Sequence, residues 1–106
     1  MENIFGQKEE LTKLVEYQKD SIVSKEIIRK EKGTVTLFAF DNGQGLSEHT
    51  APFDALVYLL DGKAEVTIDE KTQILNAGDI IIMPANKRHA INSREPFKML
   101  LVMIRA

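Results

Sequence analysis

Residues 43–62 read Gly-Gln-Gly-Leu-Ser-Glu-His-Thr-Ala-Pro-Phe-Asp-Ala-Leu-Val-Tyr-Leu-Leu-Asp-Gly and decide the fold. A glycine-rich turn leads to a histidine, then to a proline, and then to the apolar run at 55–60. A short continuous apolar run that is bounded by turn residues is typical of a buried β-strand. Asp61-Gly62 closes the run, and this dipeptide predicts a tight hairpin turn.

The rest of the chain continues this pattern of short strands and turns. Upstream, residues 34–40 are rich in β-branched and aromatic residues. Downstream, further short segments with strand character are found at 64–68, 72–75, 80–83, 89–92 and 97–104. Strands that alternate with turns every 8 to 12 residues predict a small all-β barrel or sandwich.

The N-terminal residues have a different pattern. Leu11, Leu14 and Val15 have the i, i+3, i+4 spacing of an amphipathic helix. We therefore expect a helix of two or three turns between Lys8 and Gln18, with an irregular arm as the alternative because so short a helix needs packing. With 106 residues the chain forms one domain, divided into an arm at 1–20 and a barrel at 21–106.

Composition excludes several classes of function. The net charge is −2 and the charges are interspersed, so nothing resembles the basic face of a nucleic-acid-binding protein. The longest apolar runs are six residues, far below the roughly 18 that a membrane span requires. The first residues lack a secretory signal, and the absence of cysteine fits a reducing compartment. We expect a cytoplasmic protein that binds neither nucleic acid nor membranes.

The chain resembles the cupin family, which are small jelly-roll barrels defined by two short motifs. The matching residues of the first motif are its histidine, proline and closing glycine, at His49, Pro52 and Gly62. Those of the second motif match in spacing at Gly78, Pro84 and His89, with Asn86 in place of a glycine. The resemblance extends from about Ser21 to Ile104 and implies a single-domain, RmlC-like jelly-roll β-barrel.

The resemblance also implies an incomplete metal site. Metal-bearing cupins use three histidines and one glutamate, and here the second histidine would fall at Ala51 and the glutamate at Ala55. His49 and His89 are the ligand-type residues that remain. A catalytic metal usually keeps three protein ligands. The sequence therefore predicts no cofactor with certainty and leaves two alternatives. Either His49 and His89 bind a divalent transition metal weakly, or they are pocket histidines that only form hydrogen bonds.

Strand alternation predicts the pocket. If 49–59 is one strand, its odd-numbered side chains share the inner face, unless a bulge near Pro52 reverses them. Methionine fills irregular apolar space, so Met83, Met99 and Met103 are expected in the core or the pocket. The predicted pocket consists of mainly apolar residues and two histidines: His49, Ala51, Phe53, Ala55, Val57, Met83, His89 and Ile91.

These observations favour the non-covalent binding of a small organic ligand in the barrel. One alternative is a metal-dependent oxygenase or isomerase that uses His49 and His89 as ligands. Another is a structural or regulatory module that acts as a dimer. A homodimer is expected in any case, because residues 97–104 are apolar on both faces of the strand except at Lys98 and the outer face needs a cover.

Overall fold

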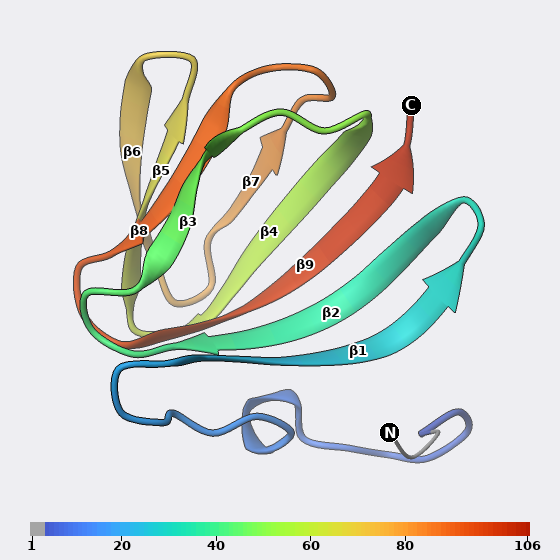
Figure 1. The fold of residues 1–106 in the computed structure, drawn as a ribbon. Helices are drawn as coiled ribbons and strands as arrows, with labels where there is room; N and C mark the ends of the chain where they lie inside the picture. The colour runs from blue at the N-terminus through green and yellow to red at the C-terminus, as the bar shows by residue number, and fades with distance from the viewer. Residues whose placement is uncertain (1–3) are drawn as a thin grey trace.

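A computed structural model describes residues 4–106 and shows nine β-strands in this part of the chain (Figure 1). One short 3-10 turn, η1, covers Leu11–Lys13. The strands are β1 (Ile22–Lys30), β2 (Gly33–Phe40), β3 (Gly45–His49), β4 (Phe53–Asp61), β5 (Lys63–Ile68), β6 (Lys71–Asn76), β7 (Ile80–Met83), β8 (His89–Ser93) and β9 (Phe97–Arg105). No helix within residues 4–106 is long and apolar enough to cross a membrane.

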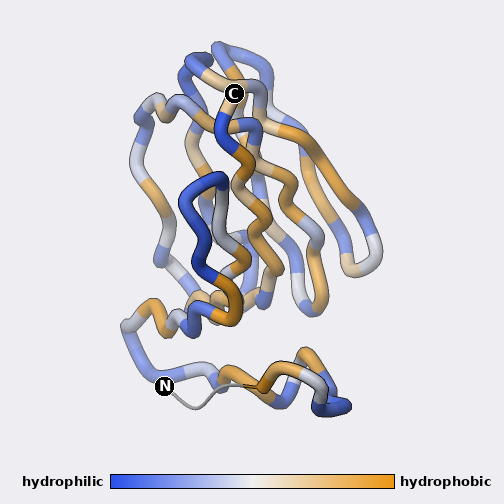
Figure 2. The backbone as a smooth tube through the Cα atoms, turned by 90° about the vertical axis from the view of Figure 1, so that its right-hand side faces the viewer, coloured by the Kyte–Doolittle hydropathy of each residue, from blue (hydrophilic) through white to orange (hydrophobic). Residues whose placement is uncertain are grey.

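The strands form two antiparallel sheets that face each other (Figure 1). The larger sheet has the order β1-β2-β9-β4-β7, and the smaller has the order β3-β8-β5-β6. From β3 onward the chain crosses between the sheets several times, as in a jelly roll. Figure 2 shows that the strands are largely hydrophobic and that the turns at their ends are largely hydrophilic. The predicted all-β jelly-roll barrel is confirmed.

The core lies between the two sheets. Phe40 and Phe97 are cross-strand partners of β2 and β9, and their rings stack with centroids 4.4 Å apart. Both are fully buried, and a buried side chain of this size contributes about 1.5–3 kcal/mol through the hydrophobic effect. The other large, fully buried side chains of this core are Leu59, Ile91, Met99, Val57 and Val66.

Of the two alternatives for the N-terminal segment, the irregular arm is confirmed and the helix of two or three turns is wrong. Only η1 forms, and Glu10 at its start provides no side-chain cap. The rest of the segment is an irregular arm that lies outside both sheets (Figures 1 and 2). Its apolar side chains pack on the outer face of the larger sheet, where Val15 is buried with Leu37 and Ala39. The apolar residues of the arm are therefore buried by packing on the sheet, without forming a helix.

Polar contacts fix the arm to the barrel. The Tyr17 hydroxyl donates to Asp61 Oδ2 over 2.6 Å, and Lys98 Nζ donates to the Thr12 carbonyl over 2.6 Å. The Lys98 ammonium also lies 5.1 Å from the centroid of the Tyr17 ring, within range of a cation–π interaction.

The hairpin predicted at Asp61-Gly62 is also wrong. β4 and β5 belong to different sheets, so Gly62 is the point at which the chain leaves one sheet for the other. Gly62 has φ +82°, and a Cβ there would overlap the Pro96 carbonyl oxygen and lie 2.8 Å from Phe97 Cα. Glycine is therefore required by the crossing between sheets.

A second crossing breaks the strand that was predicted at 49–59. β3 ends at His49 in the smaller sheet, and β4 begins at Phe53 in the larger sheet. The register of β3 against β8 is irregular between Leu46 and His49, which is a bulge before His49, not near Pro52. Alternation within one strand consequently does not determine which of residues 49–59 face inward.

Candidate functional site

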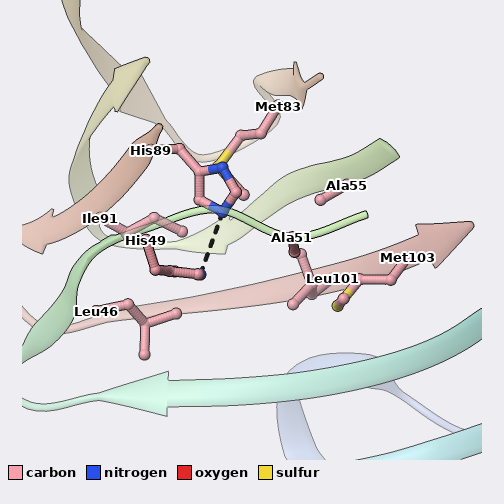
Figure 3. Close-up of a pocket in the computed structure, with 9 residues that line it drawn as sticks. All are labelled: Leu46, His49, Ala51, Ala55, Met83, His89, Ile91, Leu101 and Met103. Carbon is pink, nitrogen blue, oxygen red and sulfur yellow. Dashed lines mark hydrogen bonds between the residues drawn. The ribbon is translucent and has the colours of Figure 1, made fainter. Parts of the chain in front are cut away.

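A cavity of about 40 Å³ lies between the two sheets, and Figure 3 shows the residues around it. Ala55 of β4 pairs with Met83 of β7 on one side and with Met103 of β9 on the other, so these three form one wall. The facing wall is made by two cross-strand pairs of β3 and β8. The full lining is Leu46, His49, Ala51, Ala55, Met83, His89, Ile91, Leu101 and Met103.

The polar part of the cavity is a pair of facing histidines. His49 and His89 are direct register partners, and their Nε2 atoms lie 3.1 Å apart (Figure 3). The two rings are nearly perpendicular, at 75°, with centroids 4.4 Å apart. His49 is exposed, whereas His89 is only 4% exposed.

The backbone determines which nitrogen of each ring carries a hydrogen. His49 Nδ1 lies 2.6 Å from the Ser47 carbonyl oxygen, and His89 Nδ1 lies 3.1 Å from the Lys87 carbonyl oxygen. A carbonyl oxygen can only accept, so both Nδ1 atoms donate, and in a neutral imidazole the other nitrogen is then an acceptor. The neutral pair consequently directs two lone pairs at each other. The Nε2–Nε2 contact becomes a hydrogen bond only when one additional proton is present.

Burial makes the two histidines unequal. Desolvation, followed by the nearby His49, lowers the pKa of His89, although the hydrogen bond to the Lys87 carbonyl opposes the shift. His89 is therefore a poor site for an additional proton. Within the lining of the cavity there is no carboxylate to stabilise a second positive charge. The pair can thus accept one or two hydrogen bonds from a bound group or hold a single proton.

Six of the eight residues predicted for the pocket line the cavity: His49, Ala51, Ala55, Met83, His89 and Ile91. Phe53 and Val57 do not. Phe53 is the first residue of β4, and its ring lies under the Arg105 guanidinium at 4.9 Å. Val57 points inward but is fully buried in the core beyond the cavity.

Leu46, Leu101 and Met103 complete the lining, and Leu46 and Leu101 were missed from the sequence. Met103 was expected in the core or the pocket. Leu101 is two residues from Met103 on β9, so the same alternation could have identified it. Leu46 could not be found in this way. It is three residues from His49, and two such residues share a face only because of the bulge between them.

The donor set does not complete a metal site. The 3.1 Å between the Nε2 atoms is compatible with two imidazoles on one ion at bond lengths of about 2.1 Å. No group of three or more histidine, cysteine, aspartate or glutamate side chains within residues 4–106 could hold a metal ion. Of the nearby carboxylates, Asp54 is exposed and accepts from the Ala85 amide. Two imidazoles alone do not supply the three protein ligands of a catalytic metal site.

Comparisons with known proteins agree with this architecture. The Cupin_2 family, described as a cupin domain, matches residues 36–103. A conserved protein of unknown function from Streptococcus pyogenes is 34% identical, with a TM-score of 0.92, over 100% of this chain and 96% of that one. A cupin superfamily protein from Desulfitobacterium hafniense is 30% identical, with a TM-score of 0.88, over 91% and 88% of the two chains.

A third solved structure is longer than this chain. The Cupin 2 conserved barrel domain protein from Leptotrichia buccalis is 40% identical, with a TM-score of 0.86. The match covers 89% of this chain but only 46% of that protein. No curated protein matches the chain.

Two antiparallel sheets that enclose a cavity define the class of jelly-roll barrel proteins. The family match covers more than half of the chain, and relatives with 30% identity or more match most of its length. The chain therefore belongs to the Cupin_2 family of cupin domains.

Proposed function

We propose that this cupin binds a small organic molecule non-covalently in the cavity between its sheets. The ligand has a compact apolar body and one hydrogen-bond donor, such as a hydroxyl or an N–H group. The observation that supports this most is the pair of Nε2 atoms at His49 and His89, which are acceptors without a hydrogen between them when both rings are neutral.

The apolar lining supports the choice of an apolar body. Seven of the nine lining residues are alanine, leucine, isoleucine or methionine. A mainly apolar cavity with a few convergent polar groups is the usual form of a small-molecule site. A single water needs about 10–15 Å³, so a cavity of about 40 Å³ suits a small group. A larger ligand would insert one end and extend past the exposed side of His49.

The histidine pair supports the choice of a donor. A hydroxyl or N–H placed against the Nε2 atoms would give the buried His89 a partner and would separate the two lone pairs. Leaving a buried acceptor unsatisfied costs about 1–3 kcal/mol. A ligand that has an apolar group in place of the donor should therefore bind at least about fivefold more weakly, since 1.4 kcal/mol corresponds to a factor of ten.

The test compares phenol with toluene, which replaces the hydroxyl by a methyl group of similar size. Amide and histidine ring NMR shifts are followed during titration at pH 7.5. We expect phenol to perturb His49, His89 and the methyl groups of Met83 and Met103, and toluene to bind more weakly. His89→Leu should abolish the preference for phenol, whereas Thr50→Ala, an exposed change beside His49, should retain it.

Two results would overturn the proposal. One is the absence of any saturable shift in the cavity residues with either compound or with other small alcohols and amines. The other is a preference for phenol that His89→Leu leaves unchanged, because the hydroxyl would then be recognised elsewhere.

A further inference from the structure

The inner face of the larger sheet continues beyond the cavity onto β2. Leu101 and Met103 of β9 line the cavity, and their direct partners on β2 are Thr36 and Thr34. Direct partners in an antiparallel pair have their side chains on the same face of the sheet. Both threonines are half-buried. Two hydroxyl groups therefore lie on this face, beside the apolar residues of the cavity.

Strand β1 extends the same two rows with charged residues. Thr36 pairs with Glu26, and Thr34 pairs with Arg29. Each row thus runs from an apolar residue at the cavity, through a hydroxyl, to a charged side chain on β1. This strand is the edge of the larger sheet (Figure 1), and Arg29 is exposed while Glu26 is half-buried. The charged ends of both rows are consequently open to water.

A β-bulge places both charged residues on the inner face. Glu26 and Arg29 are three residues apart, and such residues lie on opposite faces of a regular strand. The register of β1 against β2 shifts between Glu26 and Ile28, and this shift returns Arg29 to the inner face. The bulge in β3 does the same for Leu46 and His49. Bulges often re-aim side chains beside binding and active sites. Two separate bulges therefore direct polar side chains to the same face of the barrel interior.

The contact between Glu26 and Arg29 fixes the orientation of the guanidinium. Arg29 Nε donates to Glu26 Oε1 over 2.7 Å. A guanidinium has further N–H donors on its two terminal nitrogens, and these can bind a carboxylate in a bidentate manner. The contact with Glu26 uses Nε, so it orients Arg29 without occupying the terminal nitrogens.

A second arginine makes this face electropositive. Arg105 follows Met103 by two residues on β9, and its guanidinium lies 4.9 Å from the centroid of the Phe53 ring, its register partner. Among the described strands of the larger sheet, the register places three charged side chains on the inner face, which are Glu26, Arg29 and Arg105. Two positive charges and one negative charge favour an anion over a cation.

We infer that the ligand is a hydroxycarboxylic acid whose carboxylate binds to Arg29 beside the hydroxyls of Thr34 and Thr36. This inference rests on the proposed function, because the hydroxyl of the acid is the donor proposed there for the two histidines. Neighbouring strands are about 4.8 Å apart, so the backbone of Arg29 is about 10 Å from that of Met103. The flexible Arg29 side chain shortens this span, and an apolar ring with a short chain then connects the two polar ends of the ligand.

The first experiment compares three compounds by NMR titration at pH 7.5. They are phenol, p-hydroxyphenylpropionate and its neutral analogue p-hydroxyphenylpropionamide. We expect the acid to bind about fivefold more tightly than the amide, the factor for one charge pair that is partly exposed to water. The acid should also shift the amide signals of Arg29 and Thr34, which phenol should leave unchanged.

The second experiment changes the charges on β1. Arg29→Gln should reduce the affinity for the acid to that for the amide and leave the affinity for phenol unchanged. Glu26→Gln should raise the affinity for the acid, because it removes a negative charge and retains an acceptor for Arg29 Nε. The matched control is Arg94→Gln, since Arg94 is also exposed and its Nε lies 3.3 Å from Glu65 Oε1 of the smaller sheet. This control should leave all three affinities unchanged, and circular dichroism checks that each variant is folded.

The outcomes separate this inference from the proposed function. If phenol binds at the histidines but the acid binds no more tightly than the amide, the inference is wrong and the proposed function stands. If none of the three compounds binds, both are wrong. Equal losses of acid affinity in Arg29→Gln and Arg94→Gln would show only a general attraction of anions and would overturn the inference. Weaker acid binding in both Arg29→Gln and Glu26→Gln would also overturn it, because the bulge and not the charge of Arg29 would be responsible.

Discussion

His49 and His89 face each other through their Nε2 atoms, 3.1 Å apart, and each ring is oriented by a backbone carbonyl that precedes it in the chain. In both rings Nδ1 donates a hydrogen bond to the carbonyl oxygen two residues earlier, which is that of Ser47 for His49 and that of Lys87 for His89. The orientation of each ring is therefore local, and the register of β3 against β8 brings the two acceptors together. This relationship makes the stability of the protein sensitive to protonation.

We predict that the protein is more stable at pH 7.5 than at pH 5.5 because of His89. In the unfolded chain histidine titrates near about 6.5. Burial and the nearby His49 lower the pKa of His89 in the folded protein. Below about pH 6.5 the unfolded state thus binds more protons, and the contribution of His89 is lost as the pH falls through its folded value.

The measurement is urea denaturation between pH 5.5 and 7.5 for the wild type and for His89→Leu. The variant should have a flatter pH dependence. Thr50→Ala should have the wild-type slope. A His89→Leu slope equal to that of the wild type would show that other groups are responsible.

The alanines of the cavity provide a second prediction. Ala51 and Ala55 line the same cavity as the two histidines. Ala51→His with Ala55→Glu should therefore create four convergent ligands, including the carboxylate that the natural lining lacks. The affinity for Zn²⁺, Mn²⁺ or Fe²⁺ should rise at least roughly tenfold over the wild type, the factor produced by 1.4 kcal/mol of additional binding.

Calorimetry with each metal measures this gain. Ala51→His with Ala55→Gln is the matched control, since it has nearly the same shape without the negative charge. The metal-free double variant should be less stable than the wild type, because Ala55 is buried and a glutamate there loses hydration. Equal metal affinity in all three proteins would mean that positions 51 and 55 do not converge on the histidines.

The sequence was sufficient to predict the fold and part of the site. Strand-length apolar segments and turns predicted the barrel, and the spacing of the cupin motifs identified both histidines and both cavity alanines. Asn86, which replaces a motif glycine, has φ +65° in the structure. Asparagine tolerates this left-handed conformation, so the substitution preserves the turn.

The errors arose where the chain changes sheets. Phe53 was placed in the pocket by assuming one alternating strand from His49, but a new strand begins at Phe53 in the other sheet. Val57 does face inward as alternation predicts, yet it is buried in the core beyond the cavity. The N-terminal helix failed for a related reason. Apolar spacing at Leu11 and Val15 suits a helix, yet an arm that lies along a sheet can bury the same residues. Local pattern does not distinguish the two, because tertiary packing decides between them.

The contact between Tyr17 and Asp61 provides a third prediction. Burial, and then the hydrogen bond to Asp61, raise the pKa of the Tyr17 phenol. Tyr17→Phe should reduce the free energy of unfolding by about 1 kcal/mol and loosen the arm. Urea denaturation and the rate of tryptic cleavage at Lys13 and Lys19 measure the two effects.

Tyr58→Phe, the same change at the other tyrosine of the chain, is the control and should leave the cleavage rate unchanged. If Tyr17→Phe were cleaved no faster than the wild type, the hydrogen bond to Asp61 would not hold the arm.

The last prediction separates two effects at glycines with positive φ. Gly62 has φ +82° and Gly78 has φ +96°, so alanine at either position incurs a left-handed backbone cost of about 1–2 kcal/mol. At Gly78 nothing lies within 4 Å of an added Cβ, whereas at Gly62 the Cβ would overlap the Pro96 carbonyl oxygen. Gly62→Ala must therefore also displace the backbone of Pro96 and Phe97 at the start of β9. It should lower the free energy of unfolding by at least about 1 kcal/mol more than Gly78→Ala does, as at other overpacked sites. Chemical denaturation of the two variants measures the difference. Equal losses would mean that the chain near Pro96 moves aside freely, and that the crossing at Gly62 is held only by the conformation of its own backbone.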